Sequence, residues 1–406
     1  MNTVERGVAD DPRPDAGLGR LSTTDHGVKE EQPSKELNAD DGELESQRRT
    51  SDAQDDDVDR PPPLKGLSWL DRLLVLWIIL SMAIGIILGN LAPSVGPALQ
   101  KGTFVGVSAP IAVGLLVMMY PILCKVRFET LHMLLREKEL WRQIGISFVL
   151  NWIIAPLLMT ALSWAFLPDR RELRDGLIFV GVARCIAMVL IWTDLAGGDS
   201  DYCAVLVAFN SILQIVLFAP MAVFYVRVVS HDPTDLDGDL YKDAATSVAV
   251  FLGIPLAAAI ITRLGLRPLL GEHNYQHKFI RYIAPFSLLG LIYIIIVLFA
   301  SQGAHVVNQI TSVLRVCAPL VVYFLIIFPF TAWMMWRAGF GYKVSCTQSF
   351  TAASNNFELA IAVVTSVYGA GSEQALAATV GPLIEVPVLV ALVYVIRWFR
   401  RRWGWK

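Results

Sequence analysis

Two residues that could do chemistry, Arg184 and Cys185, stand side by side in an apolar stretch. The stretch, residues 181–192, reads Gly-Val-Ala-Arg-Cys-Ile-Ala-Met-Val-Leu-Ile-Trp. An ionised arginine at the centre of a bilayer costs at least about 2.5 kcal/mol on insertion scales, so it marks a water-lined cavity, a partner or a function. Its charge favours the thiolate form of a neighbouring cysteine, which is the form that binds soft centres. The pair predicts a site for copper(I), trivalent arsenic or antimony, with packing as the alternative role of Cys185.

The other four cysteines occur singly and form no Cys-x-x-Cys motif, so we predict neither a disulfide framework nor a structural zinc site. A single thiol suits transport, because one exchangeable bond leaves a soft substrate mobile. We interpret the remaining cysteines as packing residues: Cys124, Cys203, Cys317 and Cys346.

A second polar group interrupts another apolar stretch. It consists of Ser354, Asn355, Asn356, Phe357 and Glu358. Hydrogen bonds between neighbouring helices could explain the serine and the asparagines. Glu358 favours a functional explanation. A carboxyl group at that depth must be protonated, paired with a base such as Arg184, or bound to an ion.

A third candidate is Glu385, which lies in an apolar segment between Pro382 and Pro387. The prolines leave backbone carbonyl groups without helical partners beside the carboxyl group. Burial stabilises the neutral form of an acid, which makes Glu385 a candidate proton carrier. The alternative is a permanently neutral acid that donates one hydrogen bond.

Three amides also lie in apolar segments: Asn151, Asn210 and Gln214. Hydrogen bonding between helices is the ordinary explanation for such an amide. Gln214 is the exception, because the internal repeat described below aligns it with Glu385. Trp164 and Trp192 are interpreted as anchors at the membrane interface.

Composition indicates what must position these residues. Of 406 residues, 54% are hydrophobic and 17% are charged, against roughly 25% charged in soluble domains. This predicts an all-α polytopic protein in a lipid bilayer, without a nucleic-acid partner. Residues 1–66 differ, with 17 acidic and 9 basic side chains, and we expect them to form a disordered acidic tail on the cytosolic side.

Ten apolar segments approach the roughly 20 residues that cross a bilayer. They are residues 71–91, 104–123, 144–167, 176–195, 202–229, 244–264, 282–301, 312–335, 345–368 and 374–398.

The charges between the segments predict their orientation. Basic residues concentrate between the second and third segments, between the sixth and seventh, where Arg263 and Arg267 lie, and after the tenth. Positive charges mark cytosolic loops, so both termini are predicted to be cytosolic.

Ten segments predict two inverted halves of five, residues 67–243 and 244–406. A shift of 171 positions aligns Ala183-Arg184-Cys185 with Ser354-Asn355-Asn356, and Gln214 with Glu385. Each half thus carries one interrupted segment followed by one buried amide or acid. We expect broken helices in the fourth and ninth segments, facing one site.

Three motifs together resemble the arsenical-resistance arsenite efflux transporters of the bile acid, arsenite and riboflavin transporter superfamily. They are Gly-x-Ala-Arg-Cys-x-Ala-Met-Val at 181–189, Ser-Asn-Asn-Phe-Glu at 354–358 and Gly-Pro-Leu-Ile-Glu-Val-Pro at 381–387. The resemblance covers about residues 68–400.

The resemblance implies ten helices in a core and a panel domain, with crossing broken helices in the core. It implies that a plasma-membrane protein extrudes arsenite, sometimes with antimonite, in exchange for protons and confers arsenic resistance. Cys185 would bind the As(III) substrate, and Glu385 or Glu358 would carry the proton. The other implied site residues are Asn151, Arg184, Asn210, Ser354, Asn355, Asn356 and Phe357.

On this hypothesis Arg184 holds the thiolate and pairs with an acid in one transport state. A sodium-coupled symporter of an organic anion is the closest alternative, although such a substrate needs no thiol. The sequence contains no zinc-protease, Gly-x-Ser-x-Gly or paired-aspartate motif that would indicate an enzyme. It implies no cofactor, and it does not determine the oligomeric state.

Overall fold

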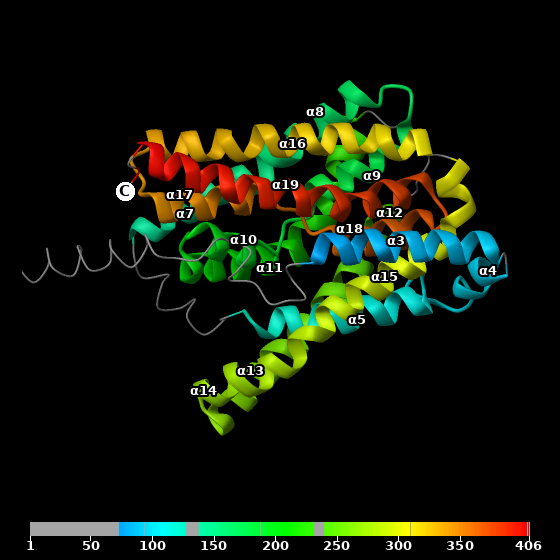
Figure 1. Ribbon diagram of the computed structural model, residues 1–406, viewed down its shortest axis with the longest axis horizontal. Coiled ribbons are helices and arrows are strands. Elements are labelled where there is room, and N and C mark those ends of the chain that lie inside the picture. Colours follow the sequence, from blue (N-terminus) through cyan, green and yellow to red (C-terminus); the bar gives the residue numbers. More distant parts are fainter. Residues whose placement is uncertain are drawn as a thin grey trace, which may run out of the picture. The chain divides into compact units, whose positions relative to one another are not determined.

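The computed structural model describes residues 73–92, 94–126, 138–186, 188–230, 239–308, 310–403 and 405, and these are mostly helical (Figure 1). The predicted acidic tail, residues 1–66, lies outside the described residues.

The helices of the first half are α3 (Leu74–Leu91), α4 (Val95–Leu99), α5 (Ala109–Cys124), α7 (Lys138–Val149), α8 (Ala155–Phe166), α9 (Arg171–Val182), α10 (Met188–Ala196) and α11 (Ser200–Val223). Those of the second half are α12 (Asp239–Val248), α13 (Ile254–Leu270), α14 (Glu272–Asn274), α15 (Arg281–Asn308), α16 (Ile310–Arg337), α17 (Tyr342–Ala353), α18 (Phe357–Tyr368) and α19 (Glu373–Trp403). Four π-helical turns join some of them: η3 (Leu150–Ile154), η4 (Phe224–Val229), η5 (Ala249–Gly253) and η6 (Tyr275–Ile280).

One short antiparallel hairpin precedes α5. Its strands are β1 (Thr103–Phe104) and β2 (Val107–Ser108), with Thr103 opposite Ser108. The hairpin is fastened to α18, because the Ser366 hydroxyl donates to the Val105 carbonyl at 2.8 Å.

Each of the ten predicted segments is helical. Among the described residues, six continuous helical stretches are long and apolar enough to cross a membrane. The predicted segments at 176–195 and 345–368 are not continuous, since each contains two helices separated by a short non-helical stretch. The chain is therefore a multi-pass membrane protein with two interrupted helical segments.

Proline explains two of the π-helical turns. Pro156 and Pro255 follow η3 and η5 within two residues. Proline cannot donate a backbone hydrogen bond, and its ring clashes with the carbonyl group four residues earlier, so the preceding turn widens. In η3 this turn carries Asn151 and Trp152, both fully buried.

The helices fall into two packing groups. One consists of α3, α5, α13 and α15, in which α15 packs on both α3 and α5, and α13 packs on α5. The other consists of α8, α9, α10, α11, α16, α17, α18 and α19, in which α19 packs on α9, α16 and α18. The first half of the chain and the second contribute helices to both groups.

The long helices lie roughly along one direction, so the bundle has two ends (Figure 1). We name them the α4 end and the C-terminal end. At the α4 end Arg315 forms a bidentate ion pair with Asp169, and Arg170 lies 3.5 Å from Glu373. The hydrogen bonds of Arg315 hold the pKa of the exposed Asp169 carboxyl down to about 2.

Contacts at the C-terminal end join segments that are distant in sequence. The Tyr342 hydroxyl donates to the Ala196 carbonyl at 2.6 Å, and Arg397 donates to the Leu195 carbonyl at 3.1 Å. The end of α10, the start of α17 and the last turns of α19 thus contact one another at this end of the bundle.

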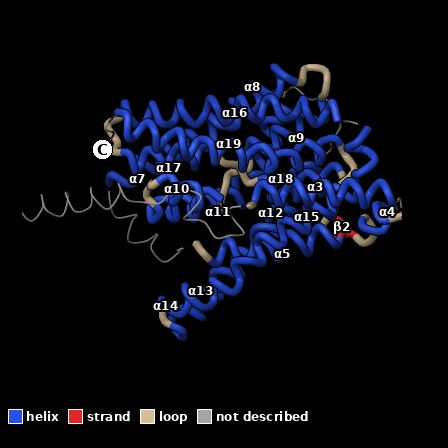
Figure 2. Tube along the Cα trace, in the orientation of Figure 1, coloured by secondary structure: helices blue, strands red, loops and turns tan. Residues whose placement is uncertain are grey.

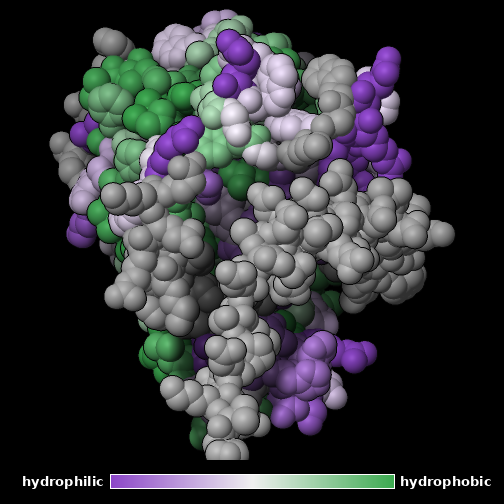
Figure 3. Space-filling view, turned by 90° about the vertical axis from the view of Figure 1, so that its left-hand side faces the viewer, coloured by the Kyte–Doolittle hydropathy of each residue, from purple (hydrophilic) through white to green (hydrophobic). Residues whose placement is uncertain are grey.

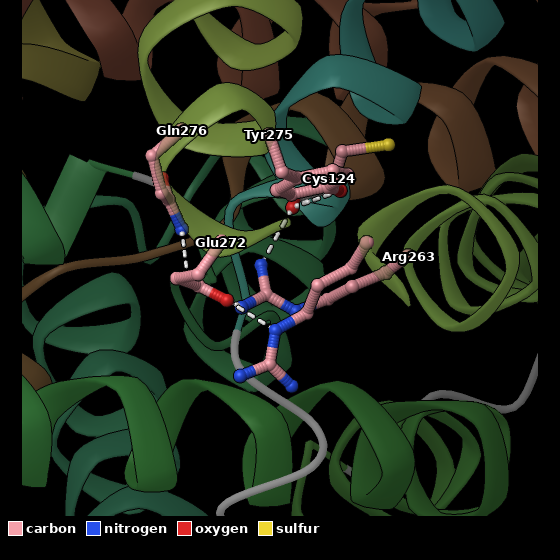
Figure 4. Close-up of polar contacts among 6 residues, drawn as sticks. Cys124, Arg263, Glu272, Tyr275 and Gln276 are labelled. Atoms are coloured by element: carbon pink, nitrogen blue, oxygen red, sulfur yellow. Dashed lines mark hydrogen bonds and ion pairs between the residues drawn. The ribbon is translucent and has the colours of Figure 1, made fainter. Parts of the chain in front are cut away.

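A buried arginine fastens the C-terminal end of α5 to α13 and η6 (Figure 4). Arg263, 1% exposed, and Tyr275 both donate to the Cys124 carbonyl, at 3.2 and 3.1 Å. Glu272 lies 3.9 Å from the same guanidinium. The interpretation of Arg263 as a loop charge is therefore wrong, because this residue satisfies a carbonyl group at a helix end.

Large apolar side chains also cover the outside of the bundle. On α3 the exposed side chains are Leu76, Ile79, Leu80, Ile84, Ile87, Leu88 and Leu91. Viewed from the C-terminal end, hydrophobic side chains gather on the upper left flank, and hydrophilic ones gather at the upper right and lower right (Figure 3). An apolar flank of this kind suits contact with lipid.

Candidate functional site

The two interrupted helices meet inside the bundle (Figure 2). The stretch after α9 and the stretch after α17 pair as antiparallel extended backbone, with Arg184 opposite Asn355. The Asn356 N–H donates to the Ala183 carbonyl at 3.1 Å, and the Cys185 N–H donates to the Ser354 carbonyl at 3.4 Å. We call these two stretches, residues 183–186 and 354–356, the crossing. The predicted interruptions are confirmed, and the residues aligned by the 171-residue shift are direct neighbours.

Arg184 lies at the centre of the crossing and is fully buried. Its guanidinium donates to the carbonyl groups of Gly181 and Ala352, which lie in the last turns of α9 and α17, and to the side chain of Asn355. It also donates to the Tyr323 hydroxyl at 3.3 Å. Carbonyl groups at a helix C-terminus carry partial negative charge, so one cation compensates two helix ends.

The expected pairing of Arg184 with an acid is not what the structure shows. Among the described residues no carboxylate lies within ion-pair distance of this guanidinium. The arginine is instead held by helix C-termini, since the two chain interruptions leave carbonyl groups there without helical partners.

Gln214 and Glu385 occupy equivalent positions on the two sides of the crossing. Gln214 Oε1 accepts from the backbone N–H of Arg184 at 3.1 Å, and Glu385 Oε1 accepts from the backbone N–H of Asn355 at 3.2 Å. Glu385 Oε1 also accepts from the Ser354 hydroxyl at 2.6 Å. Each interruption is thus capped by one side chain from the following helix, an amide in one half and an acid in the other.

The π-helical turn η3 brings more polar side chains into the same part of the bundle. The Trp152 indole donates to Asn210 Oδ1 at 3.4 Å, and Gln214 Nε2 donates to the Asn210 carbonyl at 3.5 Å. The Asn151 amide donates to the Ser147 carbonyl at 2.8 Å. Asn210 is therefore linked through Gln214 to the crossing, and Asn151 lies next to Trp152 in the same turn.

Two asparagines of the crossing have fixed amide orientations. Asn355 Oδ1 accepts from Arg184, and Asn356 Oδ1 accepts from the Leu359 N–H at 3.1 Å, which caps α18. Because each oxygen is occupied by a donor, each Nδ2 group points elsewhere.

Buried hydrogen-bond donors without partners concentrate around the crossing. Within the described ranges, five buried donor atoms in this part of the bundle have no hydrogen-bond partner, and one acceptor atom, Asn151 Oδ1, has none either. The five donors are Arg184 Nε, Trp192 Nε1, Asn210 Nδ2, Asn355 Nδ2 and Asn356 Nδ2. Buried polar groups are normally satisfied, so an excess of donors indicates a ligand that supplies oxygen lone pairs.

Cys185 adds a thiol to the same stretch of chain as Arg184. Cys185 is 3% exposed and follows directly on the residue that pairs with Asn355. A second buried thiol, Cys203, accepts from the Thr193 hydroxyl at 3.4 Å on the neighbouring helices α10 and α11. The crossing therefore offers one thiol together with several hydrogen-bond donors.

The acids differ in their surroundings. Glu385 is 4% exposed and hydrogen-bonded, whereas Glu358, at the start of α18, is partly exposed and lies within electrostatic reach of Glu385. The predicted site residue Phe357 packs its ring on Gly381 of α19, where any Cβ atom would overlap the ring. The phenyl group thus fills the space on one side of Glu385, four residues along the same helix.

Sequence reasoning did not single out Tyr323 and Trp152. The Tyr323 hydroxyl donates to the Ala352 carbonyl at 3.0 Å and accepts from Arg184. The 171-residue shift aligns Tyr323 with Trp152, so the repeat could have identified both as buried aromatic residues with a polar tip.

Trp192 was interpreted as an interface anchor, and this is wrong. It is 2% exposed, and its indole N–H is one of the unpartnered donors. The helix that carries it, α10, is enclosed by α11, α17 and α19, so the tryptophan faces protein.

Known proteins resemble this chain over most of its length. The model of the sodium bile acid symporter family matches residues 112–309. The arsenical-resistance protein Acr3 of Corynebacterium glutamicum is 47% identical over 335 residues, which cover 82% of this chain and 90% of that protein.

Two further relatives are more distant. The uncharacterized transporter slr0944 of Synechocystis is 30% identical over 358 residues, covering 82% of this chain and 91% of that protein. The arsenical-resistance protein Acr3 of Alkaliphilus metalliredigens is 28% identical over 341 residues, covering 81% and 92%.

Proposed function

The chain belongs to the family of the arsenical-resistance protein Acr3, and from this premise we propose that it extrudes arsenite in exchange for protons. The observation that carries the proposal is the crossing, which holds one cysteine, Cys185, and buried donors without partners on Arg184, Asn355 and Asn356. A thiol provides a bond to trivalent arsenic, and the donors suit the oxygens of arsenous acid. Antimonite shares both properties and is a second candidate substrate.

The binding step exchanges a hydroxyl group for the thiol. The sulfur of Cys185 forms a bond to arsenic, one As–O bond breaks, and the departing hydroxyl leaves as water with the thiol proton. The Nδ2 groups of Asn355 and Asn356 donate to the two remaining oxygens. Hydrolysis of the As–S bond reverses the step and releases arsenous acid.

Proton coupling is assigned to Glu385, with Glu358 as the second candidate. The carboxylate of Glu385 accepts hydrogen bonds from the Ser354 hydroxyl and the Asn355 N–H. A proton on this group weakens it as an acceptor, which loosens the second half of the crossing. Gln214 caps the first half without titrating, so the proton acts on one half alone.

The transport movement follows from the two packing groups. We assign α3, α5, α13 and α15 to a panel and the helices that contain the crossing to a core, which rocks against the panel. In this scheme ten spans form two inverted repeats, residues 67–243 and 244–406, with both termini cytosolic in the plasma membrane.

The test is arsenite flux in oriented vesicles that contain the purified protein. An imposed proton gradient should drive arsenite uptake into everted vesicles, and an imposed sodium gradient should not. Antimonite is measured in the same vesicles as a competitor. Flux that ignores the proton gradient would remove the antiport mechanism.

A sodium-coupled symporter of an organic anion is the second candidate, and the match to the sodium bile acid symporter family favours it. Serine, asparagine and glutamate oxygens at broken helices can bind sodium. The vesicle experiment separates the candidates, because sodium-driven uptake of an organic anion that survives Cys185→Ala would support the symporter.

A further inference from the structure

A second group of buried polar atoms without partners lies away from the crossing. Within the described part of the chain, these atoms are Asp175 Oδ1, Tyr368 Oη and Glu373 Oε2. They belong to the first turns of α9, the last residue of α18 and the first residue of α19. All three segments meet at the α4 end of the bundle, where Arg170 contacts Glu373.

Asp175 is the buried carboxyl group of this cluster. It is 3% exposed, and its Oδ2 atom lies 3.9 Å from Arg171, whose side chain is 40% exposed. Its Oδ1 atom has no partner. An ionised carboxylate in such a place is costly, because water is excluded, Arg171 is distant and solvated, and Arg174 makes its hydrogen bonds elsewhere.

The neighbouring Arg174 lies within electrostatic reach of Asp175, but its hydrogen bonds go to other groups. Its Nη1 atom donates to the carbonyl groups of Leu167 and Pro168 at 3.3 Å each. Its Cζ atom lies 3.7 Å from the centroid of the Trp164 ring. Arg174 thus caps the C-terminal end of α8 by hydrogen bonding to the carbonyl groups that follow it.

Tyr368 presents a hydroxyl group to the same place. Its ring packs edge-on against Phe179, with centroids 5.9 Å apart. Phe179 follows Asp175 by four residues on α9, so both face the same way. Tyr368 also lies within electrostatic reach of Asp175. A carboxyl group and a phenol, each with an unused polar atom, therefore face one location.

Gly176 allows α9 and α19 to approach each other beside Asp175. A Cβ atom at this position would lie 2.5 Å from the Gln374 carbonyl and 2.9 Å from Ala377. These two helices lead inward to Arg184 and Glu385 respectively. Asp175 thus lies at the outer end of the helix pair that bears the proposed proton carrier.

We propose that Asp175 is a proton-binding site at the α4 end, which takes up the proton from the water on that side before Glu385 is protonated. The proposal rests on proton antiport as the proposed function. The carboxylate accepts one proton, becomes neutral and gives it up inward. Tyr368 lies within electrostatic reach of this carboxyl group, and its unused hydroxyl is available to the protonated acid. The charged groups facing this location are Arg171, Glu172 and Arg174 on α9, Glu373 on α19 and Arg227 on η4.

Asp169 does not suit this role although it lies nearby at the same end. It is exposed, and the hydrogen bonds of Arg315 hold its pKa at about 2, so it is ionised near neutral pH. Asp169 therefore serves as the matched control.

The experiment uses everted vesicles, in which the α4 end faces the lumen, and varies luminal pH at constant external pH. Arsenite uptake by the wild type should rise as the lumen is acidified. Asp175→Asn should lose this dependence, and Tyr368→Phe, which keeps the ring on Phe179, should shift its midpoint. Asp169→Asn should behave as wild type, and Asp175→Glu should restore the dependence.

The outcomes separate the two proposals. If the wild type itself ignores luminal pH, proton antiport is refuted. If the wild type responds and Asp175→Asn keeps the same profile, the role of Asp175 is refuted and antiport stands. If Asp175→Asn does not reach the membrane, Tyr368→Phe decides, and an unshifted midpoint there overturns the proposal.

Discussion

Glu385 Oε1 accepts a hydrogen bond from the backbone N–H of Asn355 at 3.2 Å. The equivalent bond in the other half, from Arg184 to Gln214, is 3.1 Å long. Thirty residues separate donor and acceptor in both halves, so the same local geometry is built once with an acid and once with an amide. Because an amide makes this bond in the other half, Glu385→Gln is the substitution that removes the titratable group and keeps the fold.

We expect Glu385→Gln to fold and to lose proton coupling. The amide oxygen can accept from the Asn355 N–H as Gln214 does from Arg184, so the crossing should persist. Protein level in the membrane and melting temperature in detergent should match the wild type. Arsenite uptake in vesicles should no longer respond to a proton gradient.

Glu358→Gln is the matched variant for this test, because it removes the other acid near the crossing. A retained pH-gradient response in Glu385→Gln together with its loss in Glu358→Gln would transfer the proton role to Glu358.

Cys185→Ala should abolish arsenite efflux from loaded cells while leaving the amount of protein in the membrane unchanged. The substitution removes the only atom at the crossing that forms a bond to trivalent arsenic in the proposed mechanism. Cys203→Ala is the control, since Cys203 is an equally buried thiol that accepts from Thr193. Equal efflux by the Cys185 variant and the wild type would eliminate the thiol step.

Arg184→Lys should destabilise the protein. The guanidinium donates to two helix-end carbonyl groups, to Asn355 and to Tyr323, and a lysine cannot span this set from one position. Hydrogen bonds to a charged group contribute about 1.5–3 kcal/mol each, so losing two of them is a large fraction of ordinary stability. Thermal melting in detergent measures the effect.

The control for this prediction is Arg315→Lys, which changes an exposed ion pair at the α4 end. Exposed pairs contribute about 0–1 kcal/mol, so the melting temperature should barely move. Similar shifts of melting temperature in the two variants would mean that the buried contacts of Arg184 stabilise the protein no more than an exposed ion pair does.

Gly381→Ala should be destabilising through a single contact. A Cβ atom at this position overlaps the Phe357 ring, and overpacking of this kind costs about 1–3 kcal/mol. Phe357→Leu in the same chain should recover part of the loss by opening space. Melting of the two single variants and the double variant forms a cycle, and purely additive shifts would argue against the contact.

The gross fold followed from composition and segment length. Apolar segments near the length of a bilayer crossing predicted helices at all ten places, because in lipid the backbone must satisfy its own hydrogen bonds. Polar residues at 183–186 and 354–356 predicted the two interruptions for the same reason, since only a protein-lined interior tolerates them. The 171-residue shift aligned Arg184 with Asn355 but left the distance between the two halves open, and the structure shows that these two residues pair.

What only the tertiary structure decided is which face of each helix is enclosed and which ends meet. Hydropathy cannot distinguish a side chain that faces lipid from one that faces protein, because both are apolar in a membrane helix. Trp192 was therefore placed at the wrong surface, and Arg263 was counted as a loop charge. The partners of Arg184, the carbonyl groups of Gly181 and Ala352, exist only because two helices end at one point, and no local pattern records a meeting between residues 171 positions apart.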